Sequence, residues 1–241
     1  MLLEAALNGG RSPADHPAMP VSPAQLGAAA AEAVQAGAGA VHFHVRGVDG
    51  RESLAATDVA RAVAEVRRHG VPFGISTGAW IIADPGRRLA AVDEWTVLPD
   101  FVSINFDEAG AAELAGVFLR RNVGLEAGVA NPFAAERLVR SGLGNRCLRI
   151  MFEPREQDVS DAMATVAATE AVLDAAAVRT PRLLHGVHAT AWPLVDAAGA
   201  RGYGTRIGFE DTLTLPSGEV AGGNGELVRA ALARLAGVAS T

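Results

Sequence analysis

Short apolar runs and longer stretches with helical spacing alternate along the whole chain. The candidate strands, each with the length of a buried strand, cover residues 2–7, 40–46, 71–76, 101–106, 124–129, 147–152, 182–187 and 205–209. Helices are expected at residues 23–37, 57–70, 108–121, 131–141, 158–177, 191–200 and 225–235. Eight strands separated by helices predict a (β/α)8 TIM barrel, because an open doubly wound sheet usually has fewer strands and a glycine-rich nucleotide loop.

Local signals place individual helix boundaries within this pattern. Ser22 to Gln25 combines a capping box with a proline at the first helical position, which predicts a helix start. Helices are expected to end near Gly37 and at Gly70. The chain has no repeat of fixed period, no low-complexity linker and no charge block, so residues 1–241 are expected to form a single catalytic barrel domain.

The second candidate strand carries two histidines, His42 and His44, separated by one residue. Side chains alternate faces along a strand, so both imidazoles are expected on the same face, close enough to bind one metal ion. The alternative is a pair of buried core histidines bonded to the neighbouring backbone. A third ligand elsewhere in the chain is needed to favour the metal site.

A TIM barrel carries its chemistry at the carboxyl ends of its strands and in the loops that follow them. Polar side chains of this chain are concentrated at those positions. The candidates are His42, His44, Arg46, Ser76, Thr77, Ser103, Asn105, Glu126, Glu153, His185, His188, Arg206, Glu210 and Asp211.

The last candidate strand offers the third ligand. Its period of two places Arg206, Gly208 and Glu210 on one face, with Asp211 where the strand gives way to a loop. Glu210 can then reach across the barrel mouth towards the histidines, and two imidazoles with one carboxylate leave an open coordination position, as in catalytic zinc sites. The alternative is a structural arginine–carboxylate pair.

Composition excludes several classes of function. The 21 basic and 27 acidic residues give a net charge of −6, which argues against nucleic acid or an anionic membrane as a partner. No segment has the length of a membrane helix or the features of a secretory signal, so a cytoplasmic protein is expected. All 21 basic residues are arginine, and without lysine the chain has no Schiff-base or P-loop chemistry.

Three segments together resemble the β-keto acid cleavage enzymes, typified by 3-keto-5-aminohexanoate cleavage enzyme. They are Ala6 to Gly9, the His42 to Arg46 strand followed by Asp49-Gly50, and Arg206 to Asp211. The resemblance spans nearly the whole chain, and its histidine strand and terminal arginine–glycine–glutamate–aspartate pattern are specific together. It implies a zinc-dependent barrel that reacts a β-keto acid with acetyl-CoA and yields acetoacetate and a new acyl-CoA by retro-Claisen cleavage.

The resemblance also implies roles for single residues. His42, His44 and Glu210 would hold the zinc ion, and Asp211 would be the general base, oriented by Arg206. Hydroxyls that meet the substrate carboxylate are implied at Ser76 and Ser103, and a pocket carboxylate at Glu126. Arg46 is expected to orient the surroundings of the metal rather than to contact substrate. Related barrels usually associate, so a homo-oligomer, dimer or tetramer, is expected.

One position departs from the family pattern. The amino-substrate member has a glutamate just after the glycines of the first strand, where this chain has Arg11. An arginine there repels a cationic tail, which favours a β-keto acid with a neutral or anionic tail. The alternative is that Arg11 points to solvent. Two other functions also stay open: a metal-dependent hydrolase or lyase that does not use CoA, and a catalytically silent barrel.

Overall fold

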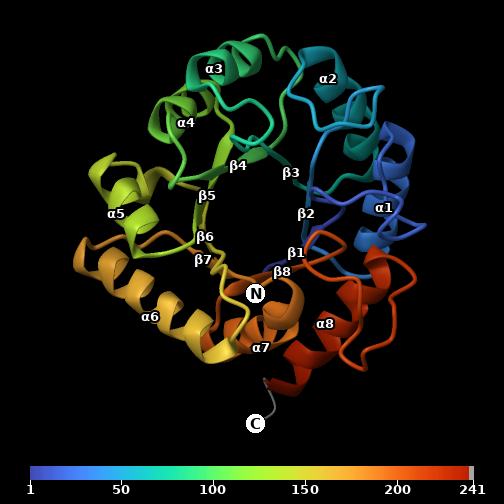
Figure 1. Cartoon of the computed structure of the whole chain (residues 1–241), viewed down its shortest axis with the longest axis vertical. Coiled ribbons are helices and arrows are strands. Elements are labelled where there is room, and N and C mark those ends of the chain that lie inside the picture. Colours follow the sequence, from blue (N-terminus) through green and yellow to red (C-terminus); the bar gives the residue numbers. More distant parts are fainter. Residues whose placement is uncertain (239–241) are drawn as a thin grey trace.

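The computed structural model describes residues 1–238 and shows eight parallel strands closed into a barrel in sequence order, with helices around the outside (Figure 1). The strands are β1 (Leu3–Ala6), β2 (Ala40–Phe43), β3 (Phe73–Ser76), β4 (Phe101–Asn105), β5 (Gly124–Val129), β6 (Arg149–Phe152), β7 (Arg182–Leu184) and β8 (Gly204–Ile207). β8 pairs with β1 and closes the ring. The predicted TIM barrel is confirmed.

The helices follow the strands in strict alternation. They are α1 (Pro23–Gln35), α2 (Ala56–Val66), α3 (Pro85–Asp93), α4 (Ala111–Arg120), α5 (Pro132–Arg140), α6 (Val159–Ala175), α7 (Ala191–Arg201) and α8 (Asn224–Val238). Three single 3-10 turns are η1 (Arg67–His69), η2 (Gly144–Arg146) and η3 (His188–Thr190). None of the helices within residues 1–238 is long and apolar enough to cross a membrane.

The predicted start of α1 is confirmed in detail. The Ser22 hydroxyl accepts from the backbone N–H of Gln25, and the Gln25 side chain accepts from the backbone N–H of Ser22. This reciprocal pair satisfies two N–H groups that the first turn of a helix leaves unpaired. Gly70 ends the α2–η1 segment in the left-handed conformation, with φ at 64°, as a glycine after a helix commonly does.

Sequence analysis missed α3. The helix has a clear start signal, because Asp84 accepts from the backbone N–H of Arg87 and Pro85 occupies the first turn. Its buried face, however, consists of Val92 and a charged residue, Arg88, whose guanidinium donates to Glu108 at 2.5 Å. A helix that buries an arginine instead of an aliphatic side chain lacks the apolar period by which helices are recognised.

The strands divide the interior into two parts. Side chains that point outward pack with the helices into the hydrophobic core, for example Phe43, Ile75 and Val102, all fully buried. The inward positions carry charged groups instead. Glu4 of β1 lies beside Arg206 of β8, and Glu126 of β5 lies beside Arg149 of β6. All four side chains are buried, so charges inside this barrel must be paired with one another.

Candidate active site

The two histidines are placed by β2 and by a side chain from the loop after β1. His42 belongs to β2, whereas His44 lies just beyond its end at Phe43. Asn8 extends the pairing past that end: its amide donates to the His44 carbonyl at 3.0 Å and accepts from the His44 N–H at 2.8 Å. Both imidazoles are therefore held on the same face, with ring centroids 5.5 Å apart.

Glu210 reaches the histidines from a turn rather than from a strand. We expected Arg206, Gly208 and Glu210 to alternate along one strand, but β8 ends at Ile207 and that register is wrong. At Gly208 a Cβ would lie 2.0 Å from the Ala6 carbonyl oxygen, so only glycine allows the chain to turn there. Gly9 in turn leaves room for Glu210, because a Cβ at Gly9 would lie 2.4 Å from the Glu210 Cγ.

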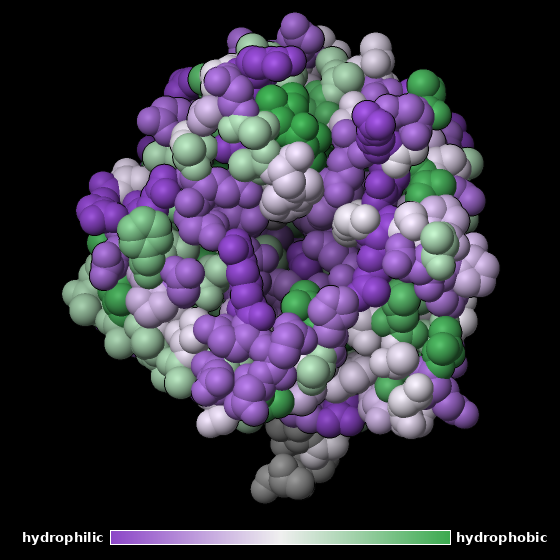
Figure 2. Space-filling view, in the orientation of Figure 1, coloured by the Kyte–Doolittle hydropathy of each residue, from purple (hydrophilic) through white to green (hydrophobic). Residues whose placement is uncertain are grey.

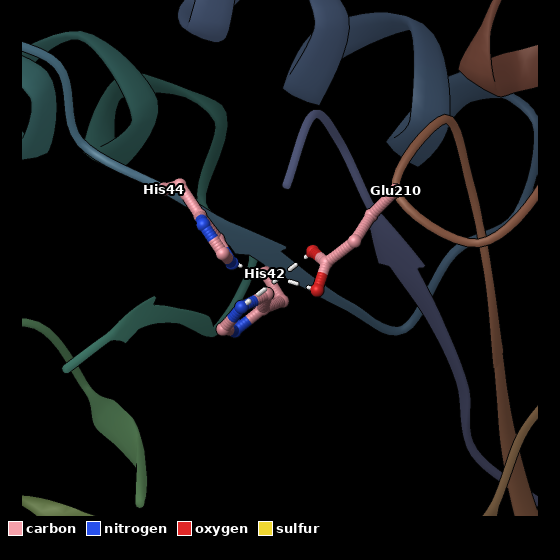
Figure 3. A group of neighbouring side chains, drawn as sticks. All are labelled: His42, His44 and Glu210. Carbon is pink, nitrogen blue, oxygen red and sulfur yellow. Dashed lines mark ion pairs between the residues drawn. The ribbon is translucent and has the colours of Figure 1, made fainter. Parts of the chain in front are cut away.

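His42, His44 and Glu210 form the upper cluster, in which the carboxylate faces both imidazoles (Figure 3). His42 Nε2 lies 3.8 Å from Glu210 Oε2, and His44 Nε2 lies 3.5 Å from Glu210 Oε1. Ligands about 2.0–2.2 Å from a tetrahedral zinc ion are about 3.4 Å apart, so these separations suit a shared ion. Glu210 Oε2 is buried and has no hydrogen-bond partner within residues 1–238. The donor set fits a divalent metal.

Glu52 supports the upper cluster from the loop after β2, and sequence analysis missed it. Its Oε2 lies 2.9 Å from His44 Nδ1 and accepts from Trp80 Nε1 at 2.8 Å. A signal for it was present, since Asp49-Gly50 is a strong hairpin turn. The resulting antiparallel bridge pairs Arg46 with Glu52 and brings Glu52 back beside His44.

A second set of charged side chains, the lower cluster, lies deeper in the barrel and consists of Glu4, Glu126 and Arg149. The Arg149 guanidinium is bonded to both carboxylates. With His42, the two glutamates also have the spacing of metal ligands. Because one oxygen of each is already neutralised by Arg149, a cation there would compete with a guanidinium. The upper cluster is the better metal site.

Asp211 and Arg206 lie next to the upper cluster. Arg206 Nη2 donates to Asp211 Oδ1 at 2.8 Å and to Glu210 Oε1 at 3.0 Å. Asp211 is fully buried, and its Oδ2 has no hydrogen-bond partner in the described chain. His185 Nδ1 lies 3.3 Å from Asp211 Oδ1, and His185 Nε2 lies 3.8 Å from Glu153 Oε2. A buried carboxylate with one free oxygen therefore stands between two cationic partners.

The charges around the site separate the pKa values of its groups. Burial lowers the pKa of His42 to about 4, despite the attraction of Glu210. Burial also acts on His44, but the carboxylates of Glu210 and Glu52 outweigh it and raise the pKa of His44 to about 9. For Asp211, burial acts against ionisation, yet Arg206 and His185 hold its pKa below the usual value. Asp211 is ionised near neutral pH, as a general base must be.

The other predicted site residues lie at different depths. Ser76 at the end of β3 pairs with Ser103 in the middle of β4, and both are buried. Glu126, in contrast, is fully buried in the lower cluster, away from any opening. Arg46 contacts neither the ligand atoms nor a carboxylate within residues 1–238; it donates to the carbonyls of Gly9, Arg11 and Gly50 and so fixes the loop after β1.

Arg11 stands at the rim. Its Nη2 lies 3.2 Å from His188 Nδ1, and its Nε donates to the Glu210 carbonyl at 3.5 Å. The side chain is partly exposed. The Arg11 side chain is therefore neither buried nor free in solvent, and its guanidinium contacts the loops that follow β7 and β8.

A cavity of about 240 Å³ opens above the upper cluster. Its lining residues include Glu210, Arg206, His185, Glu153, Asn105, Arg155 and Trp80. The face of the molecule in Figure 2 is hollowed at its centre, and hydrophilic residues surround the hollow. A larger cavity, of about 540 Å³, lies at the amino ends of β7 and β8, away from the cluster. In TIM barrels the chemistry belongs to the opposite end.

Comparisons with known proteins identify a family and agree with the fold. The model of one protein family, described as beta-keto acid cleavage enzyme, matches residues 1–172 and 134–240. No curated protein matches the chain. Among solved structures, the 3-dehydroquinate dehydratase from Geobacillus kaustophilus HTA426 is 11% identical, with a TM-score of 0.65, over 99% of this chain and 91% of that one.

A thiamine phosphate pyrophosphorylase from Pyrococcus furiosus is also 11% identical, with a TM-score of 0.56, over 98% of this chain and 96% of that one. At such low identity, these two structures show only that the barrel is shared. The family match covers almost the whole chain and includes every residue of the upper cluster.

Proposed function

The chain belongs to the beta-keto acid cleavage enzyme family, and on that premise we propose that it is a zinc-dependent enzyme that transfers an acyl group from a β-keto acid to CoA. Acetyl-CoA is the co-substrate, and acetoacetate and a new acyl-CoA are the products. The observation that carries this proposal is the upper cluster, where two imidazoles and a carboxylate bring ligand atoms within 4.8 Å of one another below an open cavity.

The donor set supports zinc as the metal. Because the neighbouring carboxylates favour a protonated His44, metal binding would have to displace that proton. Two neutral imidazole nitrogens and one carboxylate then leave a coordination position free, as in catalytic rather than structural zinc sites. When bound, the metal would polarise the keto-acid oxygens and make the α-carbon more acidic. Its ligands would be His42, His44 and Glu210, with Glu52 holding His44 in orientation.

Asp211 would remove the α-proton of the β-keto acid. Its unpartnered Oδ2 is available to accept the proton, and Arg206 keeps the carboxylate ionised and in place. The carbanion attacks the thioester carbonyl of acetyl-CoA and CoA thiolate leaves. The thiolate then attacks the original keto carbon, the carbon–carbon bond breaks, and acetoacetate takes back a proton. Ser76 and Ser103 would donate hydrogen bonds to the substrate carboxylate.

The mouth of the barrel favours a substrate with a neutral or anionic tail. Arg11 and Arg155 both stand at this end, Arg11 beside His188 and Arg155 in the lining of the cavity. Asp107 pairs with the Arg155 guanidinium at 2.8 Å, so a cationic tail would meet like charge chiefly from Arg11. A keto-diacid is the substrate type that this charge pattern suits best.

The test is to follow acetoacetate release from β-keto acids with neutral, anionic and cationic tails, with and without acetyl-CoA and after metal removal. We expect release that requires both acetyl-CoA and the metal. Turnover without acetyl-CoA would instead identify a metal-dependent hydrolase or lyase, and no metal in the purified protein would indicate a silent barrel. Size measurement by light scattering tests the expected dimer or tetramer.

A further inference from the structure

Trp80 lies over the upper cluster, with its indole stacked on His44. Its side chain is 56% exposed, whereas Trp95 is buried in the core. Gly78 makes this position possible, because a Cβ at Gly78 would lie 2.2 Å from atoms of the Trp80 ring. The indole therefore rests on the backbone of its own loop, and a side chain at position 78 would displace it.

The polar edge of this indole is bonded into the support of the metal site. Trp80 Nε1 donates to Glu52 Oε2 at 2.8 Å, and the same oxygen lies 2.9 Å from His44 Nδ1. The indole also stacks on His44, with ring centroids 5.8 Å apart and planes 24° from parallel. Trp80 thus contacts both the orienting carboxylate and the imidazole that it orients.

These contacts decide which nitrogen of His44 is free. A carboxylate only accepts hydrogen bonds, so the proton shared with Glu52 stays on His44 Nδ1. His44 Nε2 is left as the ligand atom, and it is the nitrogen that faces Glu210. In metalloproteins such partners of a ligating histidine fix the orientation of its ring, and their loss weakens metal binding about 10–100-fold.

We propose that Trp80 is a positioning residue for the metal: through Glu52 and by stacking on His44, it strengthens metal binding and slows metal release. The inference rests on the proposed function, because it requires that the upper cluster binds metal. Without the indole N–H, Glu52 loses one of its two donors and is free to turn towards solvent. Without the ring, the outer face of His44 is open to water.

The test is zinc affinity, measured by competition with a chromophoric chelator on the metal-free full-length protein. Trp80→Phe keeps an aromatic ring but removes the N–H, and we expect its dissociation constant to rise about tenfold. Trp192→Phe is the matched control, since Trp192 Nε1 also donates a hydrogen bond, to the Thr214 carbonyl at 2.9 Å, outside the cluster. The control should bind zinc as the wild type does.

A double variant separates a route through Glu52 from a direct effect. Glu52→Gln should weaken zinc binding at least as much as Trp80→Phe, and the double variant should bind no more weakly than Glu52→Gln alone. The visible spectrum of the cobalt-substituted protein should change in Trp80→Phe and stay unchanged in Trp192→Phe. Circular dichroism of the metal-free variants checks that each one is folded.

The outcomes distinguish this inference from the proposed function. If the wild type binds zinc and Trp80→Phe binds it equally well, the positioning role is wrong and the proposed function stands. Fully additive effects in the double variant would also overturn the route through Glu52. If the wild type binds no metal, the proposed function itself fails.

Discussion

The upper and lower clusters both hold buried charge inside the same barrel, yet they differ in what their atoms contact. In the lower cluster, the Arg149 guanidinium bonds one oxygen of each glutamate, and the other oxygen of each is buried without a partner in the described chain. In the upper cluster, Arg206 bonds Glu210 through one oxygen and leaves Oε2 free towards His42. Glu210 lines the cavity above the upper cluster, whereas the two glutamates of the lower cluster are fully buried and Arg149 lines the larger cavity at the opposite end of the barrel.

This difference teaches that buried charge alone does not identify a site. A cluster whose charges neutralise one another serves the packing of the barrel, since breaking such a pair leaves an uncompensated buried charge. A cluster with a free ligand atom beside a cavity can bind something else. We therefore expect changes in the upper cluster to affect metal and turnover, and changes in the lower cluster to affect stability.

The largest effect on activity is expected for Glu210→Ala. The variant loses one of the three ligands. Loss of a residue that only orients a ligand weakens metal binding up to about 100-fold, so loss of the ligand itself should weaken zinc binding further and abolish turnover. Equilibrium dialysis with metal analysis measures the affinity. Urea unfolding of the metal-free protein should show little change, and a collapse of stability would contradict the division between the clusters.

Asp211→Asn should keep the metal and lose the chemistry. The variant retains the shape of the side chain but accepts no proton, so turnover should fall about 10²–10⁴-fold. Zinc content and affinity are measured alongside and should match the wild type. Loss of metal from this variant would mean that Asp211 acts on the ligands rather than on substrate.

Arg149→Met should act on the fold. It leaves Glu4 and Glu126 facing each other without their cation, at a cost of about 3–5 kcal/mol in the free energy of unfolding. Burial and Glu126 already raise the pKa of Glu4 to about 8, and without Arg149 the pKa of Glu126, now held low, should rise as well. Stability should therefore recover as the pH falls towards the unfolded pKa value near 4.5. Urea unfolding at several pH values measures this, and the zinc affinity of the folded variant should stay within a few-fold of the wild type.

The smallest effect is expected at the rim, where Arg11→Glu reverses one partly exposed charge. Screening by water limits the interaction, so we expect a shift of about tenfold in kcat/KM away from anionic and towards cationic tails. Kinetics with paired substrates measure the ratio. Arg46 fixes the loop after β1 by donating hydrogen bonds to the carbonyls of Gly9 and Arg11. Replacement of Arg46 should therefore lower turnover of both substrate types to the same extent.

Much of the barrel and of the upper cluster could be predicted from sequence because each depends on a short local pattern. The apolar runs have the length of strands, and the spacing of His42 and His44 places both on one face. Glu210 was identified correctly as a neighbour of the histidines although it lies in a turn, because strands β2 and β8 both flank β1.

The rest depends on contacts that no local pattern records. Glu52 and Trp80 meet only because a hairpin and the loop after β3 fold towards the same imidazole. Glu126 matched a pocket carboxylate in sequence, and that role stays a prediction; the structure adds an ion pair between one of its oxygens and Arg149, which no local pattern indicated. Whether a buried charge is free or paired is decided by the partner across the barrel, which lies far away in the chain.

The two sides of the upper cluster come from the end of β2 and from the turn after β8, and β1 lies between these two strands. An ion shared by His42, His44 and Glu210 would therefore link β2 to the turn after β8, across the β1–β8 pair that closes the barrel. A chain in which β8 has not yet joined the barrel has only two of the three ligands, so tight metal binding would require closure of the ring. Bound metal would then shift the folding equilibrium towards the closed ring, and the stability of the barrel would depend on the metal concentration.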